Sequence, residues 1–232
     1  IKLSKREKQK AKQNAKLKIA NKQKDEIISA ISHEFKNPIA IISGYTETIL
    51  NDEQMPQPMK IRFLKKIYSN ANKMSHIVDK LRLTLKLEEG KQELILIPCS
   101  MKKLIITCIS DLKDKYKNRE ILIQGDDITL KVDETLISMA ISNLIENALK
   151  YSEDEIIVNI SDNSITIIDK GIGIEEKELE KINQKFYRIS NNGWNNSLGL
   201  GLFIVQSVLS LHNFTLKIDS VFKNGSQFSI NY

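Results

Sequence analysis

The strongest constraint on the fold is a seven-residue repeat of apolar side chains in the first part of the chain. Between residues 28 and 49 the apolar positions alternate spacings of three and four, which is the pattern of a and d positions in a heptad. The pattern returns over residues 64–85, after a turn-forming stretch at 51–58. We therefore expect two antiparallel helices, the second ending near Gly90. The a positions are Ile28, Phe35, Ile42 and Ile49 in the first helix and Leu64, Ala71, Val78 and Leu85 in the second, and the d positions are Ile31, Pro38, Tyr45, Ile67, Met74 and Leu81.

Two antiparallel helices cannot bury both apolar seams between themselves. A second copy of the hairpin would cover what remains and form a dimeric four-helix bundle, so the sequence predicts a homodimer over residues 25–90. The preceding residues 1–24 hold ten Lys/Arg and one Glu. We expect them to form a basic linker or juxtamembrane helix beside an anionic membrane surface, with a solvated helical arm as the alternative.

The second half, residues 91–232, changes period and alternates strands with helices. We expect strands over 93–98, 119–125, 128–133, 155–161, 164–169, 214–220 and 226–232, and helices over 101–118, 134–152, 175–183 and 200–212. This order predicts a multidomain protein: the α-helical hairpin is followed by an α/β two-layer sandwich, a mixed sheet with about three helices on one face.

Composition excludes several classes of protein. The chain of 232 residues has no apolar run of about 18 residues, so we expect no bilayer-spanning helix within it. The formal charge of +6 comes from the basic residues 1–24, which argues against a nucleic-acid-binding face on the fold. Cys99 and Cys108 lack metal-ligand spacing and are expected to be reduced thiols. Because the chain begins with Ile1, we expect it to be a fragment of a longer protein.

His33 is the candidate reactive group of the first helix. It falls at an f position, away from the seam, and we place Glu34 beside it on the polar side of the helix. Glu34 could take a proton from the ring, and Asn37 lies one turn further on. Pro38 should bend the helix just past this site. An ordinary surface histidine is the alternative, since His76 also falls at an f position.

A second group of polar residues lies on the apolar helix predicted at 134–152. Asn143 and Asn147 are one turn apart, and Lys150 and Tyr151 follow. Buried asparagines need hydrogen-bond partners, which a hydrated Mg²⁺ and a triphosphate would supply. Satisfaction by neighbouring loops is the alternative.

Two glycine-containing turns add further candidates. Asp169 ends a predicted strand in "DKGIG", where a carboxylate can accept a hydrogen bond from an exocyclic amine and Gly171 and Gly173 let the backbone approach a flat ring. In "SLGLGLFIV" the pair Gly199 and Gly201 opens a helix whose free N–H groups favour phosphate. A structural turn without a ligand is the alternative for each.

The set of motifs resembles the sensor histidine kinases of two-component systems. "SHEFKNP" resembles the phosphoacceptor box, and "NLIENALKYS", "DKGIG", "KFYR" and "LGLGLFIV" look like the N, G1, F and G2 boxes, in the family's order. The resemblance extends from about residue 20 to the end of the chain. It implies a dimeric helical phosphotransfer domain joined to a Bergerat-type catalytic domain that binds ATP and Mg²⁺.

The resemblance also implies residue roles. His33 matches the phosphoacceptor, Glu34 the acidic neighbour that assists it, Asn37 the position implicated in phosphatase activity, and Asn147 the Mg²⁺ ligand. The remaining nucleotide-binding matches are Asn143, Lys150, Tyr151, Asp169, Gly171, Gly173, Phe186, Arg188, Gly199, Leu200, Gly201 and Leu202. Lys36 and Asn37 stand where Arg-Thr is most familiar. Ser197 stands where the family often has another glycine, and the preceding loop, which is expected to act as a lid, carries Trp194.

The function that the resemblance implies is a bifunctional protein-histidine kinase. The γ-phosphoryl of Mg·ATP would pass to His33 and then to an aspartate of a response regulator, with phosphatase activity on that regulator. The chain would be the cytoplasmic portion of a bacterial inner-membrane sensor anchored upstream of residue 1. An ATP hydrolase with the same nucleotide fold and a dimeric nucleotide-binding scaffold are the alternatives. Against hydrolysis, Asn143 stands where such hydrolases carry a carboxylate.

Overall fold

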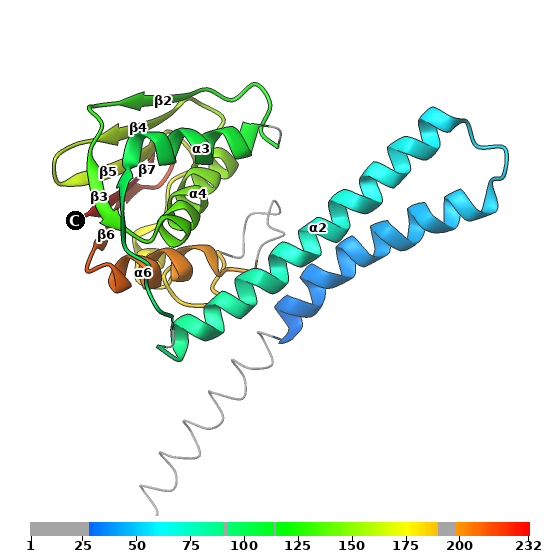
Figure 1. Ribbon diagram of the computed structural model, residues 1–232, viewed down its shortest axis with the longest axis horizontal. Helices are drawn as coiled ribbons and strands as arrows, with labels where there is room; N and C mark the ends of the chain where they lie inside the picture. Colours follow the sequence, from blue (N-terminus) through cyan, green and yellow to red (C-terminus); the bar gives the residue numbers. More distant parts are fainter. Residues whose placement is uncertain (1–27, 91, 114, 190–197) are drawn as a thin grey trace, which may run out of the picture. The chain divides into compact units, whose positions relative to one another are not determined.

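The computed structural model describes residues 28–90, 92–113, 115–189 and 198–232. They form two compact units (Figure 1): the first contains the described residues up to Lys80 together with Leu198, and the second contains the other described residues from Leu81 onward. None of the helices described is long and apolar enough to span a lipid bilayer. The basic residues 1–24 and the loop residues Trp194 and Ser197 lie outside the described part of the chain.

The helical hairpin predicted from the heptads is confirmed. Residues 28–51 are helical, a turn follows, and α2 spans Gln57–Glu88. The helix is unbroken through the buried Pro38, and the bend expected there stays a prediction. Tyr45 packs on Phe63 with ring centroids 4.8 Å apart, which places the d position of the first helix against α2.

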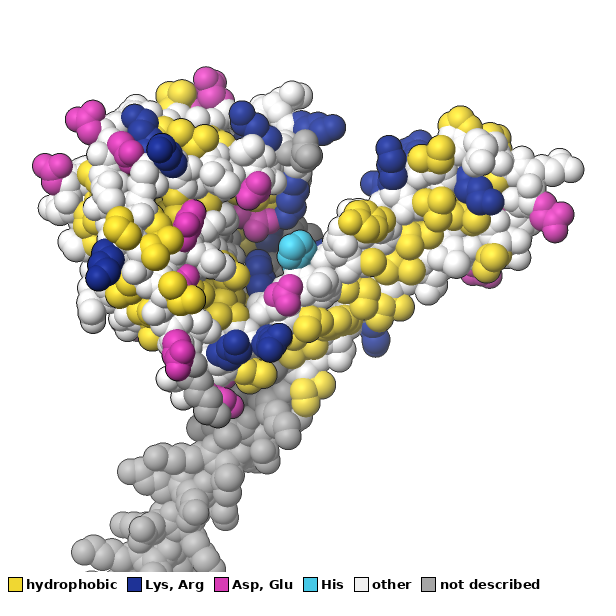
Figure 2. Space-filling model, viewed as in Figure 1, with side chains coloured by type: hydrophobic (Ala, Val, Ile, Leu, Met, Phe, Trp, Pro, Cys, Tyr) yellow, Lys and Arg dark blue, Asp and Glu magenta, His cyan; other side chains and the backbone are white. Residues whose placement is uncertain are grey.

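The single hairpin leaves an apolar stripe of α2 exposed, which we call the α2 stripe. Ile77 and the d positions of α2 are buried or half-buried, whereas the a positions are exposed. Figure 2 shows hydrophobic side chains gathered along the hairpin. The α2 stripe consists of Ile61, Leu64, Tyr68, Ala71, Val78 and Leu85.

The α/β sandwich is confirmed as well. Its main sheet has the order β2-β4-β5-β7-β6, in which β2 pairs with β4 in parallel and the other pairs are antiparallel. A separate two-stranded sheet joins β1 to β3. Helices α3, α4 and α6 cover one face of the main sheet (Figure 1). The elements are β1 (Ile97–Ser100), α3 (Met101–Lys113), β2 (Ile121–Gln124), β3 (Thr129–Val132), α4 (Glu134–Tyr151), β4 (Ile156–Ile160), β5 (Ser164–Asp169), α5 (Glu176–Leu179), α6 (Gly201–Leu211), β6 (Thr215–Val221) and β7 (Gly225–Asn231).

The core of the sandwich lies between the helices and the sheet. Helix α4 packs on β5 and α6, and the fully buried aliphatic side chains of this layer include Ile141 and Leu144 of α4, Ile165 and Ile167 of β5, and Ile204 of α6. Each such side chain contributes about 1.5–3 kcal/mol by leaving water. Cys99 and Cys108 are both buried free thiols.

Three predicted elements are wrong in their extent. The strand expected at 93–98 begins only at Ile97, because the N–H of Ile95 donates to the Asp133 carboxylate (3.1 Å) instead of a neighbouring strand. The helix expected at 101–118 ends at Lys113, and the left-handed backbone of Asn118 (φ 63°) turns the chain toward β2. The helix expected at 175–183 shortens to α5 and continues as turns.

Candidate functional site

The side chain of His33 is exposed on the first helix of the hairpin, as its heptad position predicted. Its neighbour Glu34 is buried, with 3% of its surface exposed, so the expectation that both lie on the polar side is wrong for Glu34. Adjacent helical residues point about 100° apart, which accounts for the difference. The Oε1 atom of Glu34 bonds to none of the residues that the structure describes. Asn37, one turn after His33, is half-buried.

Helix α4 supplies the amide pair of the second unit. Asp133 caps its N-terminus by accepting a hydrogen bond from the N–H of Leu136 (3.1 Å). Asn143 is buried and donates through Nδ2 to the carbonyl of Met139 (2.8 Å), so the helix itself satisfies part of this side chain. Asn147 is half-buried and forms no side-chain hydrogen bond with the described residues. Its amide oxygen is therefore available to a cation.

The start of α6 lies against Asn143, the first residue of this amide pair. A Cβ atom built at Gly201 would lie 3.4 Å from Oδ1 of Asn143. Leu200, the N-cap residue of α6, is buried, Gly201 and Leu202 are half-buried, and the cap itself makes no side-chain hydrogen bond. The first N–H groups of a helix have no partner within the helix and favour an anion. The structure thus brings the predicted phosphate-binding turn beside the predicted metal-binding amides.

The loop after β5 is held against the C-terminal end of α4. The N–H of Ile172 donates to the carbonyl of Tyr151 (3.1 Å), and a Cβ at Gly171 would lie 2.1 Å from the same oxygen. A side chain at position 171 would therefore push the loop off the helix. Lys150 and Tyr151 are both half-buried, and the Lys150 ammonium lies 5.1 Å from the centroid of the Tyr151 ring.

The other side of this loop rests on the turn between β6 and β7. The N–H of Ile174 donates to Oγ of Ser220 (2.9 Å), and the N–H of Lys223 donates to the carbonyl of Ile172 (2.7 Å). A Cβ at Gly173 would lie 2.0 Å from the Val221 carbonyl oxygen. The loop 170–174 is therefore fixed on two sides by backbone contacts.

The Asp169 carboxylate is buried, with 5% of the residue exposed. Burial raises the pKa of Asp169 above its ordinary value, while hydrogen bonds from the backbone N–H groups of Gly171 and Ser226 oppose that rise. The Gly171 bond to Oδ1 measures 2.8 Å. A buried carboxylate at the end of a strand is suited to accept a hydrogen bond from an exocyclic amine.

Sequence reasoning missed Gly225 as part of this site. A Cβ at position 225 would lie 2.0 Å from the carbonyl oxygen of Asp169, so only glycine lets β7 begin this close to β5. The sequence around Gly225 indicated only the turn of a hairpin, and it gave no sign of the contact with Asp169.

The F and G2 motifs meet through the backbone. The N–H of Phe186 donates to the carbonyl of Gly199 (3.0 Å), and both residues have left-handed backbones, with φ of 61° and 67°. Phe186 is half-buried and Arg188 is exposed.

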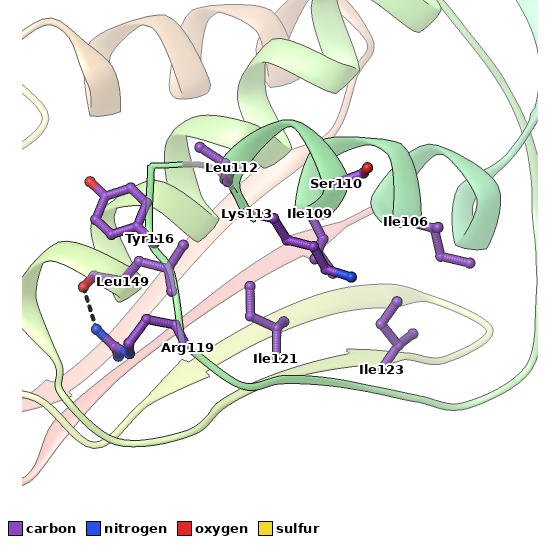
Figure 3. A pocket seen from close by; sticks show the side chains of 10 residues that line it. All are labelled: Ile106, Ile109, Ser110, Leu112, Lys113, Tyr116, Arg119, Ile121, Ile123 and Leu149. Carbon is purple, nitrogen blue, oxygen red and sulfur yellow. Dashed lines mark hydrogen bonds between the residues drawn. The ribbon is translucent and has the colours of Figure 1, made fainter. Parts of the chain in front are cut away.

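A separate cavity of about 300 Å³ opens between α3 and β2, and Figure 3 shows its lining. None of the predicted site residues lines it. Arg119 crosses one end and donates hydrogen bonds to the carbonyls of Leu149 and Asp154 (2.9 Å each). The lining residues are Ile106, Ile109, Ser110, Leu112, Lys113, Tyr116, Arg119, Ile121, Ile123 and Leu149.

Comparison with known proteins assigns both units. Residues 23–90 match the family described as "His Kinase A (phospho-acceptor) domain", and residues 132–232 match "Histidine kinase-, DNA gyrase B-, and HSP90-like ATPase". The chain belongs to the sensor histidine kinases. Its resemblance to that family, first seen in the order of the motifs, is thereby confirmed.

The curated proteins to which the chain is similar have names of sensor proteins. The Pseudomonas aeruginosa phosphate regulon sensor protein PhoR is 31% identical over 218 residues, which are 89% of this chain and 49% of that protein. The Mycolicibacterium smegmatis sensor-like histidine kinase SenX3 is 27% identical over 217 residues, 89% of this chain and 56% of that protein. The chain thus spans about half the length of these relatives.

Solved structures of kinases share the fold. The Acinetobacter baumannii histidine kinase AdeS superposes with a TM-score of 0.64 at 20% identity, covering 85% of this chain and 95% of that one. Full-length ShkA in complex with AMPPNP has a TM-score of 0.64 at 19% identity, covering 87% of this chain and 44% of that one.

Replacing Asp169 by Asn should change how stability depends on pH. Because the native pKa of Asp169 is raised, the folded state holds this proton more tightly than the unfolded state, and the wild type loses stability as pH rises through the native pKa. The variant lacks this loss. We expect the difference in melting temperature, variant minus wild type, to become more positive from about pH 4 to about pH 8 in thermal unfolding without nucleotide. A difference that does not change with pH would contradict the burial of an ionisable carboxyl here.

Proposed function

We propose that the chain catalyses transfer of the γ-phosphoryl group of ATP to a ring nitrogen of His33. The observation that carries the proposal is the pairing of an exposed histidine on the hairpin with a second unit in which α4, the loop 170–174 and the start of α6 converge. In the transfer, the nitrogen lone pair forms the P–N bond while the bond between the γ-phosphorus and the bridging oxygen breaks. ADP leaves with that electron pair, and the ring loses its other nitrogen's proton.

The second unit supplies positioning and charge stabilisation rather than covalent chemistry. The Asp169 carboxylate would accept a hydrogen bond from the exocyclic amine of adenine. The N–H groups at the start of α6 would donate to phosphate oxygens, and the Lys150 ammonium would neutralise part of the phosphate charge. Asn147, whose amide oxygen is available, fits a Mg²⁺ ligand, with Asn143 beside it. Bound Mg²⁺ would neutralise negative charge on the phosphate oxygens during the transfer.

For the proton that leaves His33, we propose the buried Glu34 carboxylate as acceptor. Its Oε1 atom bonds to none of the described residues and thus has capacity to accept a hydrogen bond. No hydrogen bond joins Glu34 to His33 in this structure, so the ring or the carboxylate would have to rotate before the proton moves. His33 and the proposed nucleotide site belong to different units, so the second unit would have to bring the γ-phosphate within reach of the ring.

We further propose that phosphorylated His33 passes its phosphoryl group to an aspartate of a response regulator. Asn37, one turn from His33, would hold a water for the reverse activity, phosphatase action on that regulator. The names of the relatives, such as "phosphate regulon sensor protein", support placement in a longer sensor. In that protein, residues 1–24 would lie beside the anionic cytoplasmic leaflet.

ATP hydrolysis is the rival activity, and the structure gives it little support. A hydrolase needs a carboxylate that activates water near the metal-binding amide. Glu146, adjacent to Asn147, forms an ion pair with Lys115 instead. Burial of Lys115 opposes its charge, yet the hydrogen bond and the charge of Glu146 raise the pKa of Lys115 above its ordinary value. The partner of Glu146 thus stays cationic.

Incubation with γ-labelled ATP and Mg²⁺ tests the proposal. We expect acid-labile label on the wild type and on His76→Gln, a matched control at the other outward-facing histidine, and no label on His33→Gln. Label on His33→Gln would overturn the assignment of the phosphoacceptor. Release of free phosphate without labelled protein would favour the hydrolase, and nucleotide binding without either product would favour the scaffold.

The dimer has its own test, because the α2 stripe is what a second copy would cover. Val78 is 50% exposed in the single chain and lies in the middle of the stripe. Val78→Glu should therefore convert a dimer into a monomer in light-scattering measurements, since each copy would bury an unpaired charge in the interface. Lys73→Glu, an exposed site off the stripe, should remain dimeric. A wild type that is monomeric at micromolar concentration would contradict the four-helix bundle.

A further inference from the structure

The connector between α2 and β1, residues 89–96, ends in exposed apolar side chains. Ile95 is 75% exposed and Leu96 is 42% exposed. Burial in a core does not hold these residues in place. The connector is instead attached to the N-cap of α4 through the N–H of Ile95, which donates to Oδ2 of Asp133 (3.1 Å).

Asp133 joins this connector to α4. The residue is buried, with 8% exposed, and its other carboxylate oxygen accepts the N–H of Leu136 in the first turn of α4. The carboxylate therefore bridges the backbone of the connector and the backbone of the helix. Hydrogen bonds to a carboxylate are about twice as strong as those between neutral groups.

His212 connects Asp133 to the C-terminal end of α6. This residue, at the C-cap of α6, is 8% exposed, and its Nε2 accepts the N–H of Asp133 (3.0 Å). Because Nε2 accepts, the ring proton is assigned to Nδ1, which donates to the carbonyl of Val208 (2.8 Å). Both ring nitrogens are thus used, and the ring is fixed in one tautomer.

We propose that Asp133 and His212 are positioning residues that couple nucleotide occupancy to the connector between α2 and β1. This rests on the proposed function, in which nucleotide binds at the start of α6. The start of α6 lies on Asn143 of α4, while its end is bonded through His212 to the N-cap of the same helix. Nucleotide that orders the start of α6 stabilises this whole chain of contacts, including the Ile95 hydrogen bond.

Amide hydrogen exchange at Ile95, followed by NMR with and without Mg·AMPPNP, tests the coupling. In the wild type we expect nucleotide to slow exchange at Ile95 several-fold. His212→Leu removes the Nε2 acceptor and should make this exchange faster and insensitive to nucleotide. His212→Gln, whose amide oxygen can accept the Asp133 N–H, should restore part of the effect, and the surface variant His76→Leu should behave as wild type.

A second variant keeps the test decisive where His212→Leu does not fold. Asp133→Asn retains the backbone N–H that bonds to His212 and an oxygen that can cap α4, but it replaces the second oxygen with a donor that cannot accept from Ile95. Exchange at Ile95 should then lose its response to nucleotide, while amides of α6 keep theirs. Calorimetry separates the two hypotheses: absence of nucleotide binding overturns the proposed function, whereas binding without protection of Ile95 overturns the coupling alone.

Discussion

The burial of α4 is the interaction on which the candidate nucleotide site depends. Side chains such as Ile141, Leu144 and Ile145 are fully buried between the sheet and the neighbouring helices. At about 1.5–3 kcal/mol each, their burial outweighs a hydrogen bond of about 1 kcal/mol. Apolar packing therefore fixes the position and rotation of the helix, and this determines where its polar groups lie. Asn143 lies against the start of α6, and the Tyr151 carbonyl accepts a hydrogen bond from the loop after β5.

The proposed nucleotide binding would account for the feature that packing alone would disfavour. A carboxylate buried as deeply as Asp169 destabilises the ionised form, and two backbone N–H groups offset only part of that cost. An asparagine would avoid the charge. The glycines at 171 and 225 bring other backbone segments within reach of this residue, so the surroundings as well as the carboxylate are specialised. Such a site is what a hydrogen bond from a nucleobase amine requires.

The sequence predicted the hairpin and the sandwich because each depends on a strong periodicity. Heptads at Phe35 and Ile67 identify helices whatever their partner, and the apolar run around Leu144 identifies a buried helix. The prediction of a strand over 93–98 was wrong because an apolar stretch need not pair with a neighbouring strand. Here the N–H of Ile95 donates to the carboxylate of Asp133, which is distant in the sequence.

Side-chain environments were harder to predict than elements. His33 was placed correctly because an f position points away from the seam in any hairpin. The environment of Glu34 was predicted wrongly, since its burial depends on packing next to that seam. The contact of Gly225 with Asp169 joins strands far apart in the chain, and no local pattern in "NGS" reports it.

Titration of the ¹⁵N-labelled chain with Mg·AMPPNP, followed by NMR, tests most directly whether these elements form one nucleotide site. The account predicts that the largest chemical-shift changes fall on the amides of Asn147, Gly171 and Gly201. The amides of Ile106 and Ile123, which line the cavity between α3 and β2, should change little. Changes centred on that cavity, or none at saturating nucleotide, would contradict it.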